Sequence, residues 1–297
     1  MLKSEQEQAM RYGFIIPGGD VYTIPELAQK AEAAGWDAVF IPDCISIETD
    51  QYPATAWYDP WIVLAAIAVH TRRVRIGTMV TPLSRRRPWK VARETVTLDH
   101  LSGGRLILPV GLGAAEDDAG FYKVGEVMER KTRAKLLDES LEIITGLWSG
   151  QPLYYEGEHY QVRGMTLLPP PVQSPRIPIW VVGAWPRGKS MQRALCYDGL
   201  LPNKLNEDGG LAEITPGDIR AIKKYIEEHR ASHTPFDIVW EGRTPGEDRE
   251  QAAAIVRQWE EAGATWWLEA MWESDVTMDD VRRRIEQGPP RGDRLTP

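Results

Sequence analysis

Short runs of β-forming residues alternate with longer segments of helical period along almost the whole chain, and this alternation constrains the fold more than any other feature. The expected strands are residues 11–17, 37–43, 73–82, 105–113, 177–183, 199–203, 236–242 and 265–272. The expected helices between and after them are residues 23–35, 59–71, 88–102, 129–150, 188–197, 216–231, 249–264 and 278–288. This pattern implies parallel strands joined by helices. Eight such units predict an α/β fold, the TIM (β/α)8 barrel, whose active site lies at the carboxyl ends of the strands.

A doubly wound open sheet is the alternative architecture. It has fewer strands and usually carries the pattern G-x-G-x-x-G after its first strand. The corresponding turn here reads PGGDVY and does not match. The count of units therefore favours the barrel.

Residues 114–177 interrupt the regular alternation after the fourth strand. They combine a polar loop, the helix at 129–150, an expected β-hairpin at 153–164 and a proline-rich connector at 167–178. We expect a polar N-terminal extension at residues 1–10 and a single barrel domain at 11–297 with an insertion at about 114–177. In the first helix, Thr23 and Glu26 have the spacing of a capping box.

Composition narrows the class of ligand. The 297 residues carry a net charge of −8, which disfavours nucleic acid and anionic membranes as partners and favours a small molecule. Cys44 and Cys196 are the only cysteines, so a disulfide framework is not expected and a reducing cytoplasm fits. The longest apolar run, residues 61–69, is too short to span a bilayer, and the opening residues lack the apolar core of a signal peptide.

Residues just past the expected strands are the candidates for a ligand site in a barrel. Glycine or alanine follows strands four and five, in VGLGAA and VVGAW, where it would let the backbone approach a ligand closely or simply make a tight turn. Polar residues at the other strand ends include Asp43, Asn203, Glu241 and Glu269. Of these, Asp43 is the candidate for catalytic work, although loop carboxylates are commonly solvated.

The segment GAWPRGKS after strand five places Arg187, Lys189 and Ser190 at the start of a helix. Free N–H groups and the positive end of the helix dipole attract phosphate there, and a solvated basic turn is the alternative. The letters also match the P-loop pattern G-x-x-x-x-G-K-S, which makes nucleotide hydrolysis a minor alternative. A P-loop belongs to an open sheet, and Trp185 and Pro186 are bulky for a loop that wraps phosphate.

Other catalytic patterns are weak. The five histidines are scattered. His229 and His233 are four residues apart, but the first ends a charged helix and the second lies in the loop before strand seven, so no metal site is expected. The sequence holds no G-x-S-x-G pattern, and neither cysteine has a neighbouring histidine, which leaves nucleophilic hydrolysis without its usual residues.

Several phrases occur in order from Met10 to about Asn203 and resemble a known family. They read GWDAVFIPD, RVRIGTMVTPL, VARETVTLDHLSGGRLILPVGLG, LDESLEIITGLWSG, YEGEHYQV, PPPVQSPRIPIWVVG and ALCYDG. The family is that of the luciferase-like flavin-dependent oxidoreductases, which includes bacterial luciferase, two-component alkane and alkanesulfonate monooxygenases, and dehydrogenases that use the deazaflavin coenzyme F420.

The resemblance implies a TIM barrel with an insertion and a flavin or deazaflavin at the carboxyl ends of the strands. It implies a non-proline cis peptide between Met79 and Val80, beside the flavin ring. Deazaflavin sugar-phosphate dehydrogenases carry His and Glu where this chain has Cys44 and Ala114. Those proton-transfer groups are missing, which argues against that particular dehydrogenase chemistry.

The function expected on this basis is a two-component monooxygenase that uses reduced FMN from a separate flavin reductase, and O2, on a small organic substrate. The alternatives are hydride transfer with coenzyme F420 and a non-enzymatic flavin-binding protein. A homo-oligomer is also expected.

Site residues are expected in three groups. Met79, Val80, Leu112 and Gly113 should line the flavin ring, with Asp43 and Cys44 on its reactive side. The cofactor phosphate should lie against Gly183, Ala184 and Trp185, with Arg187, Lys189 or Ser190. Arg85 or Arg87, from the basic run after strand three, should contact an anionic substrate or the acidic cofactor tail, while at least one of the three adjacent arginines stays solvated.

Overall fold

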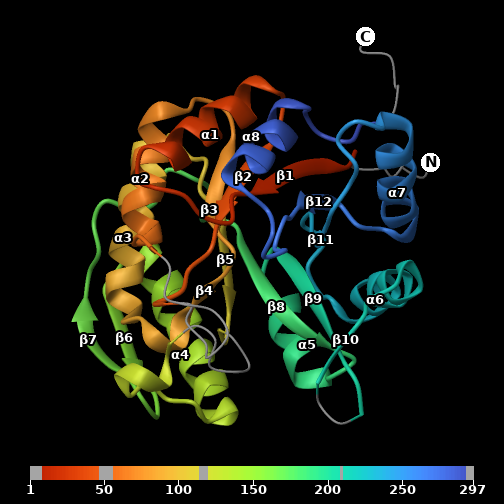
Figure 1. The fold of residues 1–297 in the computed structure, drawn as a ribbon. Helices are drawn as coiled ribbons and strands as arrows, with labels where there is room; N and C mark the ends of the chain where they lie inside the picture. Colours follow the sequence, from red (N-terminus) through yellow and green to blue (C-terminus); the bar gives the residue numbers. More distant parts are fainter. Residues whose placement is uncertain (1–8, 47–55, 114–119, 208–209, 292–297) are drawn as a thin grey trace, which may run out of the picture.

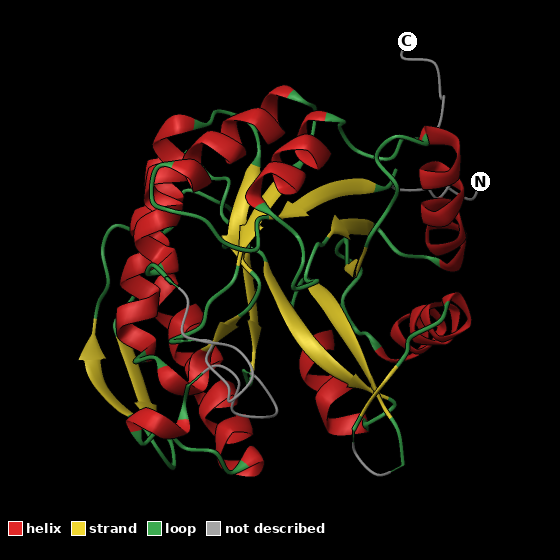
Figure 2. Ribbon diagram, viewed as in Figure 1, coloured by secondary structure: helices red, strands yellow, loops and turns green. Residues whose placement is uncertain are grey.

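The computed structural model confirms the barrel (Figures 1 and 2). It describes residues 9–46, 56–113, 120–207 and 210–291, and the expected extension at 1–10 lies almost entirely outside this range. The barrel strands are β1 (Arg11–Ile15), β2 (Ala38–Ile41), β3 (Arg75–Thr78), β4 (Thr81–Pro82), β5 (Leu108–Gly111), β8 (Ile179–Trp185), β9 (Gly199–Leu205), β11 (Asp237–Gly242) and β12 (Trp266–Glu269). The helices are α1 (Thr23–Ala33), α2 (Pro60–His70), α3 (Pro88–Ser102), α4 (Arg130–Trp148), α5 (Gly188–Leu195), α6 (Pro216–His229), α7 (Arg249–Ala262) and α8 (Met278–Glu286).

Parallel pairing closes the sheet into a barrel. The strands follow the order β3-β2-β1-β12-β11-β9-β8-β5-β4, and β3 returns to the start of the β5 segment through the bridge between Ile76 and Leu106. The third expected strand consists of two short strands, β3 and β4, and the peptide between Met79 and Val80, which lie between them, is cis. That cis bond is the one expected from the family resemblance. Together β3 and β4 occupy one of the eight strand positions of the barrel.

The barrel interior is filled by aromatic side chains. Trp180 and Trp266 have ring centroids 5.2 Å apart, and Phe40 lies 5.5 Å from Trp180. All three are fully buried, with Met79 and Leu201 packed against their cluster. Such close packing is typical of TIM barrels, in which side chains rather than a channel occupy the centre. A larger apolar core lies between the strands and the surrounding helices.

The stretch at 114–177 has two different parts. Helix α4 takes its place in the ring and packs against α3, whereas the antiparallel pair β6 (Leu153–Glu156) and β7 (Gln161–Met165) lies outside the ring (Figure 1). Glu139 of α4 holds the hairpin turn, because its carboxylate accepts hydrogen bonds from the backbone N–H groups of residues 158–160. The polar loop at 114–119 lies outside the described residues.

The first helix begins differently from the sequence expectation. The Thr23 hydroxyl donates to the Asp20 carboxylate, which also accepts the backbone N–H groups of Tyr22 and Thr23. The helix start has no side-chain cap from Thr23 to Glu26. The expected capping box is therefore wrong, because a carboxylate outside the pattern supplies the acceptors.

Candidate functional site

A cavity of about 280 Å3 opens at the carboxyl ends of the barrel strands. Its floor is apolar, since Met79, Leu201 and Val239 line it and also pack against the aromatic core of the barrel. The remaining lining residues are Val80, Val182, Pro202, Asn203, Trp240, Glu241 and Trp272. We call this space the mouth cavity. A flat ring system is the kind of ligand that such an apolar floor can hold.

Glu241 brings the one carboxylate among the lining residues into the mouth cavity. It is two residues beyond Val239 on β11, and residues two apart in a strand point to the same side. The Glu241 side chain is exposed to solvent at the mouth of the cavity. The protein atoms crowded around the carboxyl still desolvate it and raise its pKa, opposed by a hydrogen bond from Trp272.

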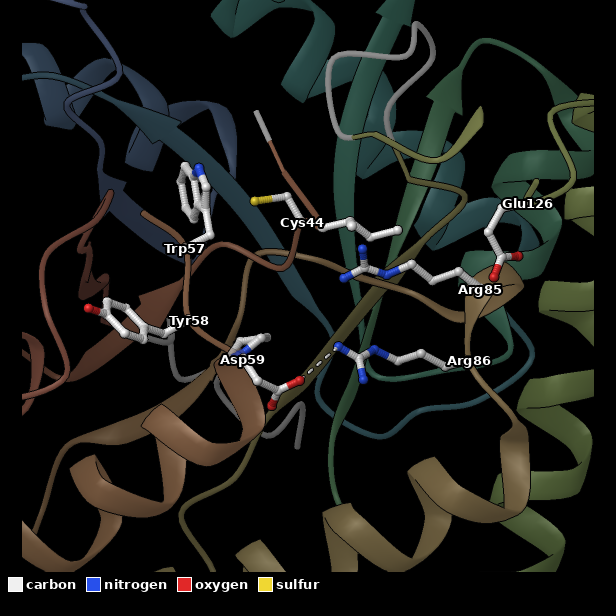
Figure 3. Close-up of a pocket in the computed structure, with 9 residues that line it drawn as sticks. Cys44, Trp57, Tyr58, Asp59, Arg85, Arg86 and Glu126 are labelled. Atoms are coloured by element: carbon white, nitrogen blue, oxygen red, sulfur yellow. Dashed lines mark ion pairs between the residues drawn. The ribbon is translucent and has the colours of Figure 1, made fainter. Parts of the chain in front are cut away.

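A second cavity of about 360 Å3 lies at the same end of the barrel, between the segment after β2, the start of α2 and the segment after β4. Figure 3 shows Arg85 and Arg86 reaching side by side toward Cys44 and Asp59. Its lining residues are Cys44, Ile45, Trp57, Tyr58, Asp59, Pro60, Arg85, Arg86 and Glu126. We call this space the arginine cavity.

Asp43 lies behind the arginine cavity in a buried ion pair. Its carboxylate side chain is 0% exposed and accepts hydrogen bonds from Arg85 and from Nε and Nη2 of Arg86, the latter two at 3.1 and 2.9 Å. Burial lowers the pKa of Arg85 to about 10, and that of Arg86 is also lowered. The carboxylate that the sequence predicted to be catalytic is therefore bound by two guanidinium groups.

The expected substrate arginines separate in the structure. Arg85 lines the arginine cavity but is bound to Asp43, and Arg86, to which the sequence assigned no role, is its partner there. Arg87 is exposed at the start of α3 and lines neither cavity. The expectation that at least one of the three is solvated is met by Arg87, and contact with an anionic substrate stays a prediction.

Only two of the four residues expected to line the flavin ring lie at the mouth cavity. Met79 and Val80 line the mouth cavity, whereas Leu112 and Gly113 do not. The Leu112 carbonyl oxygen accepts a hydrogen bond from Arg133 Nη1 at 3.2 Å. Gly113 has a φ of +84°, which suits glycine and explains its presence without a ligand. Cys44 lines the arginine cavity instead of the mouth cavity.

The segment after strand five is more strand-like than a phosphate-wrapping loop. Gly183, Ala184 and Trp185 belong to β8 and pair with residues 202–204 of β9, which argues against the P-loop reading. A Cβ on Gly183 would lie 2.3 Å from Leu200 Cδ1, so packing, and not ligand approach, requires glycine there.

The donors at the start of α5 remain available to an anion. Arg187, Gly188 and Lys189 are exposed, and a Cβ on Gly188 would meet open space. The Ser190 hydroxyl oxygen accepts the Ala184 N–H at 2.9 Å, which leaves its own proton free to donate. Two cations, a hydroxyl and a helix start form a donor set that suits a phosphate.

Two site residues were named from the sequence only by position. Asn203 and Glu241 follow their strands, yet nothing in composition or spacing gave them a role. The alternation of side chains along β11 was the available signal for Glu241. Trp272 lies beyond the last strand, and its place beside Glu241 depends on the closure of the barrel.

Within residues 9–46, 56–113, 120–207 and 210–291, no three His, Cys, Asp or Glu side chains gather as metal ligands would. Among the described helices, none has both the length and the apolar character needed to cross a membrane.

Comparison with known proteins places this geometry among relatives. Residues 6–290 match a family model described as luciferase-like monooxygenase. An uncharacterized protein of Mycobacterium tuberculosis is 30% identical over 243 residues, which cover 77% of this chain and 80% of the relative. An F420-dependent glucose-6-phosphate dehydrogenase of Nakamurella multipartita is 32% identical over 243 residues, covering 80% of this chain and 67% of the relative.

Solved structures share the fold at low identity. An F420-dependent secondary alcohol dehydrogenase superposes with a TM-score of 0.74 at 18% identity, covering 94% of this chain and 96% of the other. A monooxygenase of Streptomyces bottropensis superposes with a TM-score of 0.70 at 16% identity, covering 94% and 97%.

Proposed function

The chain belongs to the family of luciferase-like monooxygenases, and on that premise we propose that it is a two-component monooxygenase using reduced FMN and O2 on a small organic substrate. Membership makes it an enzyme of the oxidoreductase class, in a family that also includes F420-dependent members. The observation that carries the proposal is the apolar floor of the mouth cavity beside the donor set of α5. A separate flavin reductase and a homo-oligomeric state are part of the proposal.

The residues present fit a flavin. Met79 and Val80 would hold one part of the ring, and Arg187, Lys189 and Ser190 would bind the phosphate. The adjoining strands β8 and β9 connect these two regions, because Val182 lines the mouth cavity and Ala184 pairs with Asn203. When bound, the flavin supplies the redox chemistry, while the protein contributes binding, orientation and exclusion of water.

Hydride transfer with coenzyme F420 is the second candidate. It is favoured by the relative named as an F420-dependent glucose-6-phosphate dehydrogenase, at 32% identity. Against that particular chemistry, Cys44 stands where such dehydrogenases carry histidine. The same donor set at α5 would serve the phosphate of either cofactor.

Titration of the purified protein with each reduced cofactor, without oxygen and then with it, tests the proposal. We expect reduced FMN to bind and O2 uptake to depend on added substrate. If reduced F420 binds and supports turnover while reduced FMN does not, the monooxygenase proposal is wrong and hydride transfer with F420 replaces it. Absence of binding by either cofactor would overturn both.

The phosphate placement has its own test. Arg187→Ala combined with Lys189→Ala should weaken FMN binding about 5- to 30-fold, because each exposed cation contributes on the order of 0.5–1 kcal/mol. Riboflavin, which lacks the phosphate, should bind the double variant and the parent equally. Lys224→Ala, on the exposed face of α6, is the matched control. Unchanged FMN affinity in the double variant would contradict the side-chain contribution.

A further inference from the structure

The mouth cavity is chemically one-sided. Among the described residues that line it, Glu241 is the only titratable side chain, and Asn203 is the only other one with a polar group besides the two tryptophans. No described lysine or arginine lines this space. A ligand carrying a negative charge would meet a carboxyl group and an apolar floor, with no cation among the described lining residues to neutralise it.

Charged groups on the elements around Glu241 are already engaged with one another. The ion pairs are Lys204–Asp218 beside β9 at 3.0 Å, Glu269–Arg284 beside β12 at 3.2 Å, Arg243–Glu273 after β11 at 2.8 Å, and Arg86–Asp43 after β4 at 2.9 Å. Because these charged groups pair with one another, desolvation of the carboxyl is the main cause of the raised pKa of Glu241. A raised pKa keeps a larger share of the carboxyl protonated toward neutral pH, where an ordinary glutamate is ionised.

Both candidate reactions require a proton. Oxygenation that starts from a cofactor carrying one hydride equivalent converts O2 and substrate into oxygenated substrate and water, and consumes one proton. Reduction of a carbonyl by the same hydride equivalent gives an alcohol and also consumes one proton. A carboxyl that holds a proton within the cavity is suited to either.

We propose that Glu241 is the proton donor of the mouth cavity, and that the cavity accepts a neutral substrate, with the carboxyl donating a hydrogen bond to the O2-derived oxygen in oxygenation or to the substrate carbonyl oxygen in hydride reduction. This inference rests on the proposed function. The O–H bond of the Glu241 carboxyl breaks and its proton bonds to an oxygen atom: the O2-derived oxygen that leaves as water in oxygenation, or the carbonyl oxygen in hydride reduction. The hydride equivalent for either reaction would come from the reduced flavin or deazaflavin. The resulting carboxylate regains a proton from water after the product leaves.

Infrared difference spectroscopy on the cofactor-free protein tests the protonation first. Spectra of the wild type and of Glu241→Gln, each recorded across pH 5 to 9, should differ by one protonated-carboxyl band that disappears as pH rises. The matched control Glu228→Gln removes an exposed carboxylate on α6 and should leave the band unchanged. Absence of a band lost in Glu241→Gln would overturn the proposal.

Kinetics with whichever cofactor supports turnover test the transfer. Because the active form is protonated, kcat/KM of the wild type should fall as pH rises through the raised pKa. Glu241→Gln should lower kcat by about 100-fold or more and abolish that pH dependence, while Glu241→Asp should restore part of it. A Glu241→Gln enzyme with wild-type kcat and an unchanged profile would overturn the role.

The substrate class is tested separately, by measuring how two probes of similar size bind to the cofactor-free protein. Cyclohexanone should quench tryptophan fluorescence, and cyclohexanecarboxylate should quench it less at neutral pH and more as the pH is lowered. Equal or tighter binding of the anion at neutral pH would overturn the selection of a neutral substrate. If neither cofactor binds, the proposed function is wrong. The infrared spectra would then still test whether Glu241 is protonated, and the probe binding would still test whether the cavity prefers a neutral molecule to an anion.

Discussion

Replacing Asp43 by asparagine tests whether this carboxylate serves chiefly to hold the two arginines behind the arginine cavity. The side chain of Arg85 is 7% exposed and that of Asp43 is 0% exposed, so the pair has little access to water. Arg86 donates twice to the same carboxylate. An asparagine keeps one oxygen acceptor but turns an amide N–H2 toward donors, and it carries no charge.

The expected loss is large because the substitution leaves buried guanidinium charge without its counter-ion. Breaking a buried ion pair from one side costs about 3–5 kcal/mol. An unfolding entropy of about 2.1 cal/mol/K per residue gives about 0.6 kcal/mol/K for this chain, so Tm should fall by roughly 5–8 °C. Arg85, whose pKa burial already lowers to about 10, becomes still easier to deprotonate.

Differential scanning fluorimetry of Asp43→Asn against Asp59→Asn gives the comparison. Asp59 lies 4.0 Å from Arg86 Nη2 but is half exposed, and its capping bonds to Trp61 and Ile62 can be made equally by asparagine. Its substitution should cost about 1 kcal/mol or less. Equal melting temperatures for Asp43→Asn and the wild type would refute the assignment of Asp43 as the buried counter-ion.

Gly183→Ala should destabilise the barrel by about 1–3 kcal/mol in urea unfolding, since its Cβ would meet Leu200 at 2.3 Å, whereas Gly188→Ala, whose Cβ meets open space, should be nearly neutral. Similar midpoints for the two would contradict the packing argument. Burial raises the pKa of Asp237 despite its ion pair with Arg11, so the native state binds the extra proton and stability should decrease as pH rises from about 4 through the raised pKa. Asp237→Asn should flatten this part of the stability curve, and an unaltered curve would assign the pH dependence to other groups.

The fold was accessible from the sequence because each unit of the barrel carries its own local signals. Val39 and Phe40 lie in an apolar run, and Pro60 and Gly103 mark a helix start and a helix end. Strand limits were less accurate, since pairing with neighbours decides where a strand ends. β8 extends to Trp185 because β9 pairs with it that far.

The candidate site was only partly accessible, because it depends on which side chains the barrel brings together. Met79 and Val80 were expected at the cofactor and do line the mouth cavity. The sequence could not reveal that Asp43 is shared by Arg85 and Arg86, since adjacent arginines in a loop carry no signal of direction. Nor could it show that a strand-end glutamate would be the one acid among the described residues that line the mouth cavity.

The aromatic layer formed by Phe40, Trp180 and Trp266 makes the mouth cavity a dead end. These rings lie beneath Met79 and Leu201, so within the described barrel nothing the size of a substrate passes through to the far side. A ligand of the mouth cavity therefore cannot arrive through the centre of the described barrel, and has to enter and leave on the side where the strands have their carboxyl ends.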